Sequence, residues 1–435
     1  MKKILILLAL IIPAGVQAQS LMKMIKDRAK QSAANIAVER AEKAVNRSLD
    51  AAEKPADKAA APANEKTAPA KNTGEKGSPA AADKPALTAY SKYDFIPGQS
   101  VFYADEFAGQ NIGELPTGWN SNGSAEVVTL NGMEGNWLKL AQNAWFIAAN
   151  KTVASKDFTV EFDLVMQFQN LGWGYPDVEF GLTAAPKTIA SDNELLRTSM
   201  TGDKKLSVLI QPGTEERSHV SMSSYKGRES FFYTPSKAYS AIENFYGKIS
   251  HVAMQFQGER LRVWINGDKV YDLPQAIPAE GAFNRLFFHL SSSNYKDEQV
   301  GVYLSHIKMA NGLPDMRSKL LNEGHFSTTG ILFDTNASTI KAESAGVLRE
   351  IAAVLSSNAA LSIRIIGHTD SDGTAENNQK LSLARAEAVK NALANEYGID
   401  AARLQTAGKG ATAPVAGNTT STGKARNRRV EFVKI

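Results

Sequence analysis

Two successive folded domains, an antiparallel β-sandwich and then an α/β sandwich, are predicted by this sequence. Between residues 95 and 312 apolar and polar side chains alternate with period two, which is typical of strands that bury one face. After residue 324 strand patterns alternate with helical patterns, which is typical of a compact α/β domain. A chain of 435 residues is also too long for one ordinary core. We therefore expect a multidomain protein.

The first 90 residues are predicted to lie outside both domains. Residues 1–18 combine two lysines, an apolar run and small residues, as in a secretory signal peptide. Residues 19–54 carry apolar side chains at helical spacing. This pattern predicts an amphipathic helix that seats on a membrane, joins partner helices or stays solvated. Residues 55–90 are rich in Ala, Pro and Lys with few large apolar side chains, which predicts a disordered linker.

The strands of the segment 95–312 are clearest around one predicted hairpin. Residues 251–256 form an alternating strand, and the next strand ends at Asn266-Gly267, a pair that favours a type I′ turn. Glu161 and Asp163 alternate with apolar residues in another strand. Since half-buried strands place polar residues on the outer face, we expect these two carboxylates to face solvent.

Around this hairpin, through LRVWINGDKV at 261–270, the segment resembles the laminin-G or concanavalin-like jelly roll. The resemblance implies a sandwich that binds carbohydrate or, with three carboxylates at alternate strand positions, hydrolyses glycans. Glu161 and Asp163 fit the first two positions, but no third carboxylate follows them. A glycan-binding or protein-interaction role stays open for this sandwich. An outer-membrane β-barrel is disfavoured because the strands are short and their connections are long.

The C-terminal segment 324–435 is predicted to be a compact α/β domain. Strands are expected at 329–333, 361–366, 403–407 and 429–434, and helices at 343–355 and 376–396, because apolar residues recur there at the matching periods.

Five motifs of this segment occur in the order of the OmpA/MotB/Pal-type cell-wall-binding domain, which the segment resembles over its whole length. The motifs are ILFDTNAS at 331–338, GHTDSDG at 367–373, NQKLSLARAEAVKNAL at 378–393, YGIDAARLQTAGKG at 397–410 and NRRVEF at 427–432. The resemblance implies binding of peptidoglycan through the free end of a diaminopimelate residue in its stem peptide.

Asp370 and Arg385 are the predicted ligand-binding pair. The free end of diaminopimelate is a zwitterion, so its receptor needs a carboxylate for the ammonium and a guanidinium for the carboxylate. Asn378 and Arg385 lie seven residues apart on one helical face, which should turn towards the loop that carries Asp370. Arg suits this role because its planar fork holds a carboxylate through two hydrogen bonds.

Four weaker site residues follow from the resemblance alone. Thr369 and Asn378 would add polar contacts, Asn336 would lie at the edge of the pocket, and Arg428 would reach the ligand from the last strand. Because side chains alternate along a strand, only one of Arg428 and Arg429 should line the pocket.

The sequence therefore predicts a secreted, non-enzymatic protein of the periplasm, associated with the outer membrane, that anchors itself to peptidoglycan. No catalytic residue, cofactor or metal site is predicted, and the small net charge of +4 argues against nucleic acid as a partner. A glycan or an envelope protein would bind the sandwich. Two rival functions are a carbohydrate-active enzyme tethered to the wall and a stator-like component of a membrane motor.

Overall fold

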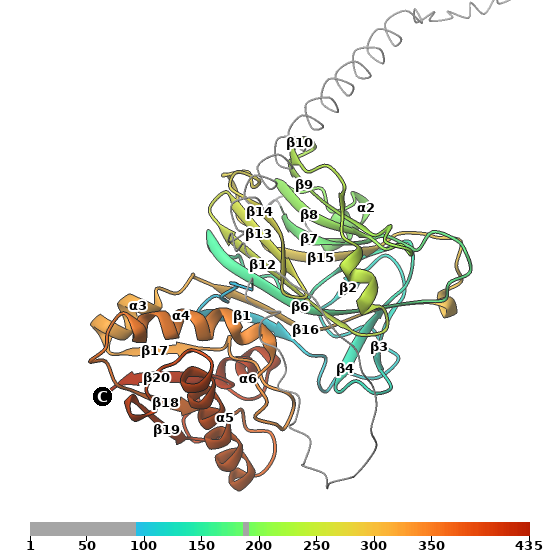
Figure 1. Ribbon diagram of the computed structural model, residues 1–435. Helices are drawn as coiled ribbons and strands as arrows, with labels where there is room; N and C mark the ends of the chain where they lie inside the picture. Colours follow the sequence, from blue (N-terminus) through green and yellow to red (C-terminus); the bar gives the residue numbers. More distant parts are fainter. Residues whose placement is uncertain (1–92, 186–190) are drawn as a thin grey trace, which may run out of the picture. The chain divides into compact units, whose positions relative to one another are not determined.

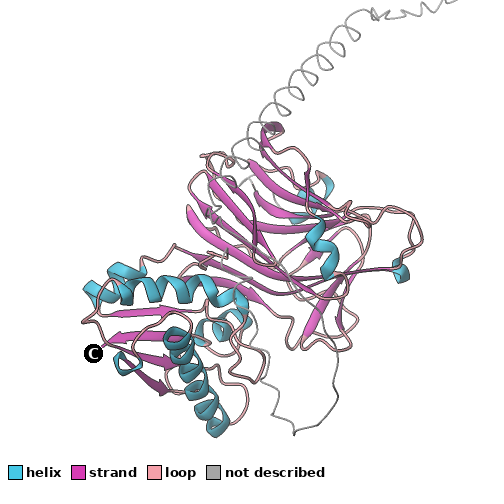
Figure 2. Ribbon diagram, in the orientation of Figure 1, coloured by secondary structure: helices cyan, strands magenta, loops and turns pink. Residues whose placement is uncertain are grey.

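Strands dominate the computed structural model, which describes residues 93–185 and 191–435 (Figures 1 and 2). The predicted signal peptide, amphipathic helix and linker lie outside the described residues. The described residues cluster as one compact unit. Among the described residues, no helix is long and apolar enough to cross a membrane.

The segment predicted as a sandwich contains two antiparallel sheets of eight strands each. The first sheet consists, in spatial order, of β14 (Asp268–Leu273), β13 (Arg260–Ile265), β12 (Ile249–Gln257), β6 (Asp157–Phe168), β16 (Val300–Asn311), β4 (Asn136–Leu140) and β3 (Ala125–Thr129), with β1 (Ser100–Asp105) paired to β16. The second sheet consists of β10 (Glu229–Tyr233), β9 (His219–Lys226), β8 (Lys204–Gln211), β7 (Val178–Ala184), β15 (Arg285–Leu290), β5 (Ala144–Ile147) and β2 (Asn120–Ser121), with β11 (Lys237–Ala238) paired to β9.

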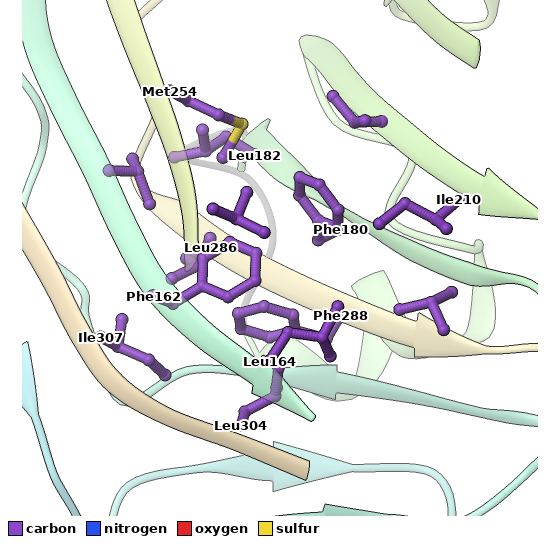
Figure 3. Packing of buried hydrophobic residues seen from close by; sticks show 14 of the residues in the cluster. Phe162, Leu164, Phe180, Leu182, Ile210, Met254, Leu286, Phe288, Leu304 and Ile307 are labelled. Atoms are coloured by element: carbon purple, nitrogen blue, oxygen red, sulfur yellow. The ribbon is translucent and has the colours of Figure 1, made fainter. Parts of the chain in front are cut away.

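A single apolar core lies between these two sheets (Figure 3). Phe162 of the first sheet packs edge-on against Phe180 and Phe288 of the second, with ring centroids 5.0 and 5.2 Å apart. The predicted antiparallel sandwich is therefore present, while its assignment to the jelly-roll class stays a prediction. A short helix, α2 (Asp192–Arg197), packs on the outer face of the second sheet through Leu195 and Leu196.

The predicted hairpin turn lies between β13 and β14. Asn266 and Gly267 have φ values of 52° and 86°. Two successive residues with positive φ define the type I′ turn that the Asn-Gly pair favours.

The C-terminal domain is built on a mixed sheet of four strands in the order β17, β20, β18 and β19. Its elements are α3 (Met316–Ser318), β17 (His325–Thr328), α4 (Ala345–Ser356), β18 (Ile363–Gly367), α5 (Ala375–Asn395), β19 (Leu404–Gly408), α6 (Ser421–Asn427) and β20 (Val430–Lys434). Strands β18 and β19 are parallel, while β20 is antiparallel to both β17 and β18. Apolar residues of α4 and α5 share one core with the sheet.

The predicted strand at 329–333 is wrong, because the first strand of this domain ends at Thr328. Beyond Thr328 the backbone is held by the side chain of Ser344, whose hydroxyl accepts a hydrogen bond from the Leu332 amide at 2.8 Å. Only an isolated bridge between Phe333 and Ile340 remains there. The backbone is thus held by a side chain where a strand was expected.

Strand β1 of the sandwich also packs against α6 of the C-terminal domain. The Ala104 amide donates to the Thr422 hydroxyl at 2.9 Å, and Ala104 shares a small buried cluster with Ala425. This contact places the end of β1 beside the loop that follows β18.

Candidate functional site

Asp370 lies in the loop between β18 and α5. One of its carboxylate oxygens accepts the Asp372 amide at 3.1 Å. The Asn378 side-chain amide donates to the carbonyl oxygens of Asp370 and Asp372, at 3.3 and 2.9 Å. Asn378 therefore ties the loop to the first turns of α5, so that its main role is to shape the loop that presents Asp370.

Close packing of α5 against the sheet places the next helical turn over this loop. A Cβ atom on Gly367 would lie 2.1 Å from the Ser382 carbonyl oxygen, and one on Gly408 would lie 2.6 Å from the Leu383 amide nitrogen. Only glycine permits so close an approach. The Ser382 hydroxyl also accepts the Gly410 amide at 2.8 Å. These contacts fix the register of α5 and therefore the position of Arg385, one turn further on.

The Arg385 guanidinium is partly desolvated and contacts no carboxylate of the described residues. Its Nε donates to the Ala337 carbonyl at 3.0 Å, and the group lies 4.8 Å above the Phe333 ring. Burial lowers the pKa of Arg385, and repulsion from Arg428 lowers it further. Attraction by Asp370 acts in the opposite direction. Within residues 93–185 and 191–435, no ion pair of Arg385 with an acidic side chain is formed. A cation held in this way should favour an incoming carboxylate.

Arg428 does not lie on the last strand as predicted but at the C-terminal end of α6. The preceding Asn427 is fully buried and accepts the Val415 amide at 2.8 Å, which fixes the chain before β20 begins. Arg428 donates to Asp370 at 2.7 Å and also pairs with Glu106 of the sandwich. Arg429 instead pairs with Glu431 at 2.6 Å.

Both Arg428 and Arg429 line the same pocket. Only the Arg428 guanidinium reaches Asp370, however, because that of Arg429 pairs with Glu431. The prediction assumed strand alternation, whereas Arg428 follows α6 and precedes β20.

All six predicted site residues line one pocket of about 380 Å³. They are Asn336, Thr369, Asp370, Asn378, Arg385 and Arg428. The Thr369 hydroxyl is buried without a hydrogen-bond partner among the described residues. Asn336 occupies a left-handed turn with a φ of 55°, which Asn tolerates better than most residues. A carboxylate, a guanidinium and free hydrogen-bonding groups in one small pocket can hold the two charges of a zwitterion.

The same pocket is also lined by sandwich residues that the sequence did not indicate as site residues. Glu161 and Asp163 were expected to face solvent, yet they are only 3% and 6% exposed. They are buried because β12 and β16 flank β6 and bring basic side chains beside them. Asp163 accepts a hydrogen bond from His251 at 2.8 Å and pairs with His306 at 3.2 Å, and Glu161 pairs with Lys308 at 3.0 Å.

Within this buried cluster the pKa values of Asp163 and His251 are strongly shifted. Burial alone would raise the pKa of Asp163, but hydrogen bonds from His251 and His306 hold it well below its usual range. Burial likewise disfavours charge on His251, yet Asp163 and Glu161 outweigh it and raise the pKa of His251 to about 10. Asp163, Glu161 and His251 are therefore ionised together at neutral pH. No group of three or more His, Cys, Asp or Glu suited to a metal ion occurs among the described residues.

Comparison with known proteins matches residues 332–428 to the OmpA family. Over 100 residues the chain is 47% identical to outer membrane protein Omp38 of Acinetobacter baumannii, which covers 23% of this chain and 28% of Omp38. Over 162 residues it is 34% identical to the outer-membrane lipoprotein YfiB of Pseudomonas aeruginosa, which covers 37% of this chain and 94% of YfiB. The chain thus matches less than a third of Omp38 but nearly all of YfiB.

A solved structure, the peptidoglycan-associated lipoprotein of Burkholderia pseudomallei, is 32% identical. The match covers 25% of this chain and 89% of that one, with a TM-score of 0.23.

Proposed function

Because the chain belongs to the OmpA family through its C-terminal domain, we propose that this domain binds peptidoglycan non-covalently and anchors the protein to the cell wall. The proposed ligand is the free zwitterionic end of diaminopimelate in a stem peptide. In this assignment Asp370 takes the ammonium and Arg385 takes the carboxylate. Envelope names among the matched relatives, which include an outer membrane protein and an outer-membrane lipoprotein, support a location in the periplasm at the outer membrane.

The observation that carries this proposal is the incomplete pairing of Arg385. Among the residues that the structure describes, its guanidinium contacts backbone carbonyls and an aromatic face but no carboxylate, although it is partly desolvated. Asp370 lies in the same pocket and is neutralised by Arg428, which reaches it from the neighbouring helix α6. A ligand carboxylate would supply the anion that Arg385 lacks, and a ligand ammonium would share Asp370 with Arg428.

The proposed role is anchoring rather than catalysis. A glycoside hydrolase on the sandwich would need a pair of carboxylates free to act as acid and nucleophile. Glu161 and Asp163, the acids that suggested this rival, are closed off by Lys308, His251 and His306. Their pairing argues against a hydrolase, and binding of a glycan or an envelope protein is the role we propose for the sandwich. Trp173 and Phe231 are exposed and could make such contacts, and a glycan array would separate the two roles.

Binding to purified sacculi tests the anchoring proposal directly. The chain without its predicted signal, residues 19–435, would be compared with Asp370→Asn and Arg385→Gln. Removing one partner of a buried charged hydrogen bond costs about 2 to 5 kcal/mol, so each variant should lose at least about 30-fold in affinity. Glu376→Gln and Arg364→Gln are matched controls, because both side chains are exposed and lie outside the pocket. Undiminished binding by both pocket variants would refute the assignment.

A further inference from the structure

Glu106, at the end of β1, is held in a fixed position by its two neighbours. The carboxylate of Asp105 accepts hydrogen bonds from the Trp119 indole at 2.9 Å, the Tyr103 hydroxyl at 3.1 Å and the Phe107 amide at 3.0 Å. Phe107 is fully buried in the sandwich core and has a φ of 56°. A bulky residue adopts this strained conformation only where its surroundings impose it. The backbone on both sides of Glu106 therefore cannot shift easily.

Glu106 reaches the C-terminal pocket from this fixed position. Its carboxylate pairs with one terminal nitrogen of Arg428, while the other terminal nitrogen donates to Asp370 at 2.7 Å. Arg428 thus lies between two carboxylates, one from each domain. The contact between Ala104 and Thr422 joins the two domains only two residues before Glu106. Residues of the sandwich therefore line one side of the pocket, and Glu106 adds a negative charge to it.

The charges that face a ligand balance only when Glu106 is counted. Arg385 and Arg428 contribute two positive charges, and Asp370 and Glu106 contribute two negative ones. Three nearby acids are paired: Asp372 with Lys424 at 2.8 Å, Glu431 with Arg429 at 2.6 Å and Glu161 with Lys308 at 3.0 Å. Lys341 and Glu343 also line the pocket and add one charge of each sign, which leaves the balance unchanged. A balanced set of four charges suits a ligand whose own charges cancel.

We propose that Glu106 is a specificity-determining residue, which makes the pocket select stem-peptide ends with a free ammonium over ends whose amine is acylated. This inference rests on the proposed function and names the chemical form of the ligand. Acylation, as in an amide cross-link, removes the ammonium and leaves a net negative end. Glu106 occupies Arg428 and repels such an end, whereas without its charge Arg428 would be free to bind the ligand carboxylate.

The test uses residues 19–435 and two synthetic probes, the tripeptide L-Ala-D-Glu-diaminopimelate with a free side-chain amine and the same peptide with that amine acetylated. Dissociation constants for both would be measured by calorimetry at constant salt. Wild type should prefer the free amine. Glu106→Gln keeps a hydrogen-bond acceptor for Arg428 but removes the charge, so the preference should narrow by about 3- to 10-fold.

Glu114→Gln is the matched control, because Glu114 lies in the sandwich, is exposed and contacts Asn111 outside the pocket. This control should keep the wild-type ratio. An unchanged ratio in Glu106→Gln, or an equal loss for both probes, would overturn the inference and leave Glu106 a structural contact between the domains.

Asp370→Asn separates this inference from the proposal on which it rests. If Asp370→Asn no longer binds the free-amine probe while Glu106→Gln keeps the wild-type ratio of the two dissociation constants, the anchoring proposal is supported and the role of Glu106 is refuted. If wild type binds neither probe, or if Asp370→Asn binds like wild type, both fall together.

Discussion

Buried acids of both domains face the same pocket, and their ion pairing differs. In the sandwich, Asp163 and Glu161 are almost completely buried, and each has basic partners from neighbouring strands. In the C-terminal domain, Asp370 is shared with Arg428, and Arg385 beside it has no carboxylate partner among the described residues. The comparison teaches that burial and shifted pKa values do not by themselves mark a binding site. The useful sign is an ion whose pairing is incomplete.

The physical reason for the difference lies in how the partners are supplied. His251 lies directly opposite Asp163 across the β6–β12 pair, so the sheet itself brings acid and base together. Asp370 and Arg385 come from a loop and a helix that enclose a cavity. Strand pairing leaves no space for a ligand between the charges, whereas the loop and helix do.

The largest effect is expected from breaking the sandwich cluster. Asp163→Asn would leave His251 and His306 without their shared carboxylate, and loss of one partner in a buried ionic cluster costs about 3 to 5 kcal/mol. Urea unfolding followed by tryptophan fluorescence measures this, because all five tryptophans lie in the sandwich, between Trp119 and Trp264.

Asp203→Asn is the matched control for that measurement. Asp203 is an exposed sandwich carboxylate, so its neutralisation should change stability by no more than about 0.5 kcal/mol. If Asp163→Asn lowered the free energy of unfolding as little as the control, the cluster would contribute no net stability. The proposed difference between the cluster and the C-terminal pocket would then be wrong.

The pH dependence of sandwich stability should be the next largest effect. The pKa of His251 is raised from 6.5 to about 10 on folding, so its contribution is fully present below pH 6.5 and is lost as the pH rises towards 10. Allowing for coupling to Asp163 and Glu161, the free energy of unfolding should fall by about 3 kcal/mol over this range. Tryptophan fluorescence in urea at several pH values measures the slope, and His251→Gln should flatten it. A slope that survives in His251→Gln would assign the effect to other groups.

The C-terminal domain should respond at the opposite end of the pH scale. Hydrogen bonding from His368, against the opposing effect of burial and with help from Arg429, lowers the pKa of Glu431 to about 2. A lowered carboxyl pKa gives stability that is present above its unfolded value and is lost as the pH falls towards 2. His251 should therefore make the sandwich less stable at alkaline pH, whereas Glu431 should make the C-terminal domain less stable at acidic pH.

The six residues predicted for the C-terminal site lie in one pocket because their positions are set by local features of the chain. The spacing of Asn378, Ser382 and Arg385 on one helix defines a face, and glycines at 367 and 408 are required where that helix touches the sheet. These signals can be read from short stretches of the sequence. The expectation for Arg428 failed because the exact end of α6 depends on the buried side chain of Asn427.

The sandwich cluster could not be predicted in the same way. Alternation along β6 placed Glu161 and Asp163 on the face away from the core, where strand charges usually meet solvent. Their burial arises from the cross-strand positions of His251, His306 and Lys308, which are 88 or more residues further along the chain. Strand register over such separations is not encoded in any local pattern. The contact between Glu106 and Arg428 spans 322 positions and depends on the packing of two domains.

The smallest effect on stability is expected from Asp370→Asn, although its effect on binding should be large. The pair of Asp370 and Arg428 is partly open to solvent, with side chains 11% and 31% exposed, and Arg428 keeps Glu106 as a partner. Because Asn can still accept a hydrogen bond from Arg428, the expected loss is about 1 kcal/mol. The C-terminal domain contains no tryptophan, so scanning calorimetry of residues 19–435 is the suitable measurement. A loss as large as that of Asp163→Asn would make Asp370 a structural acid, and its loss of sacculus binding would then report misfolding rather than a missing ligand contact.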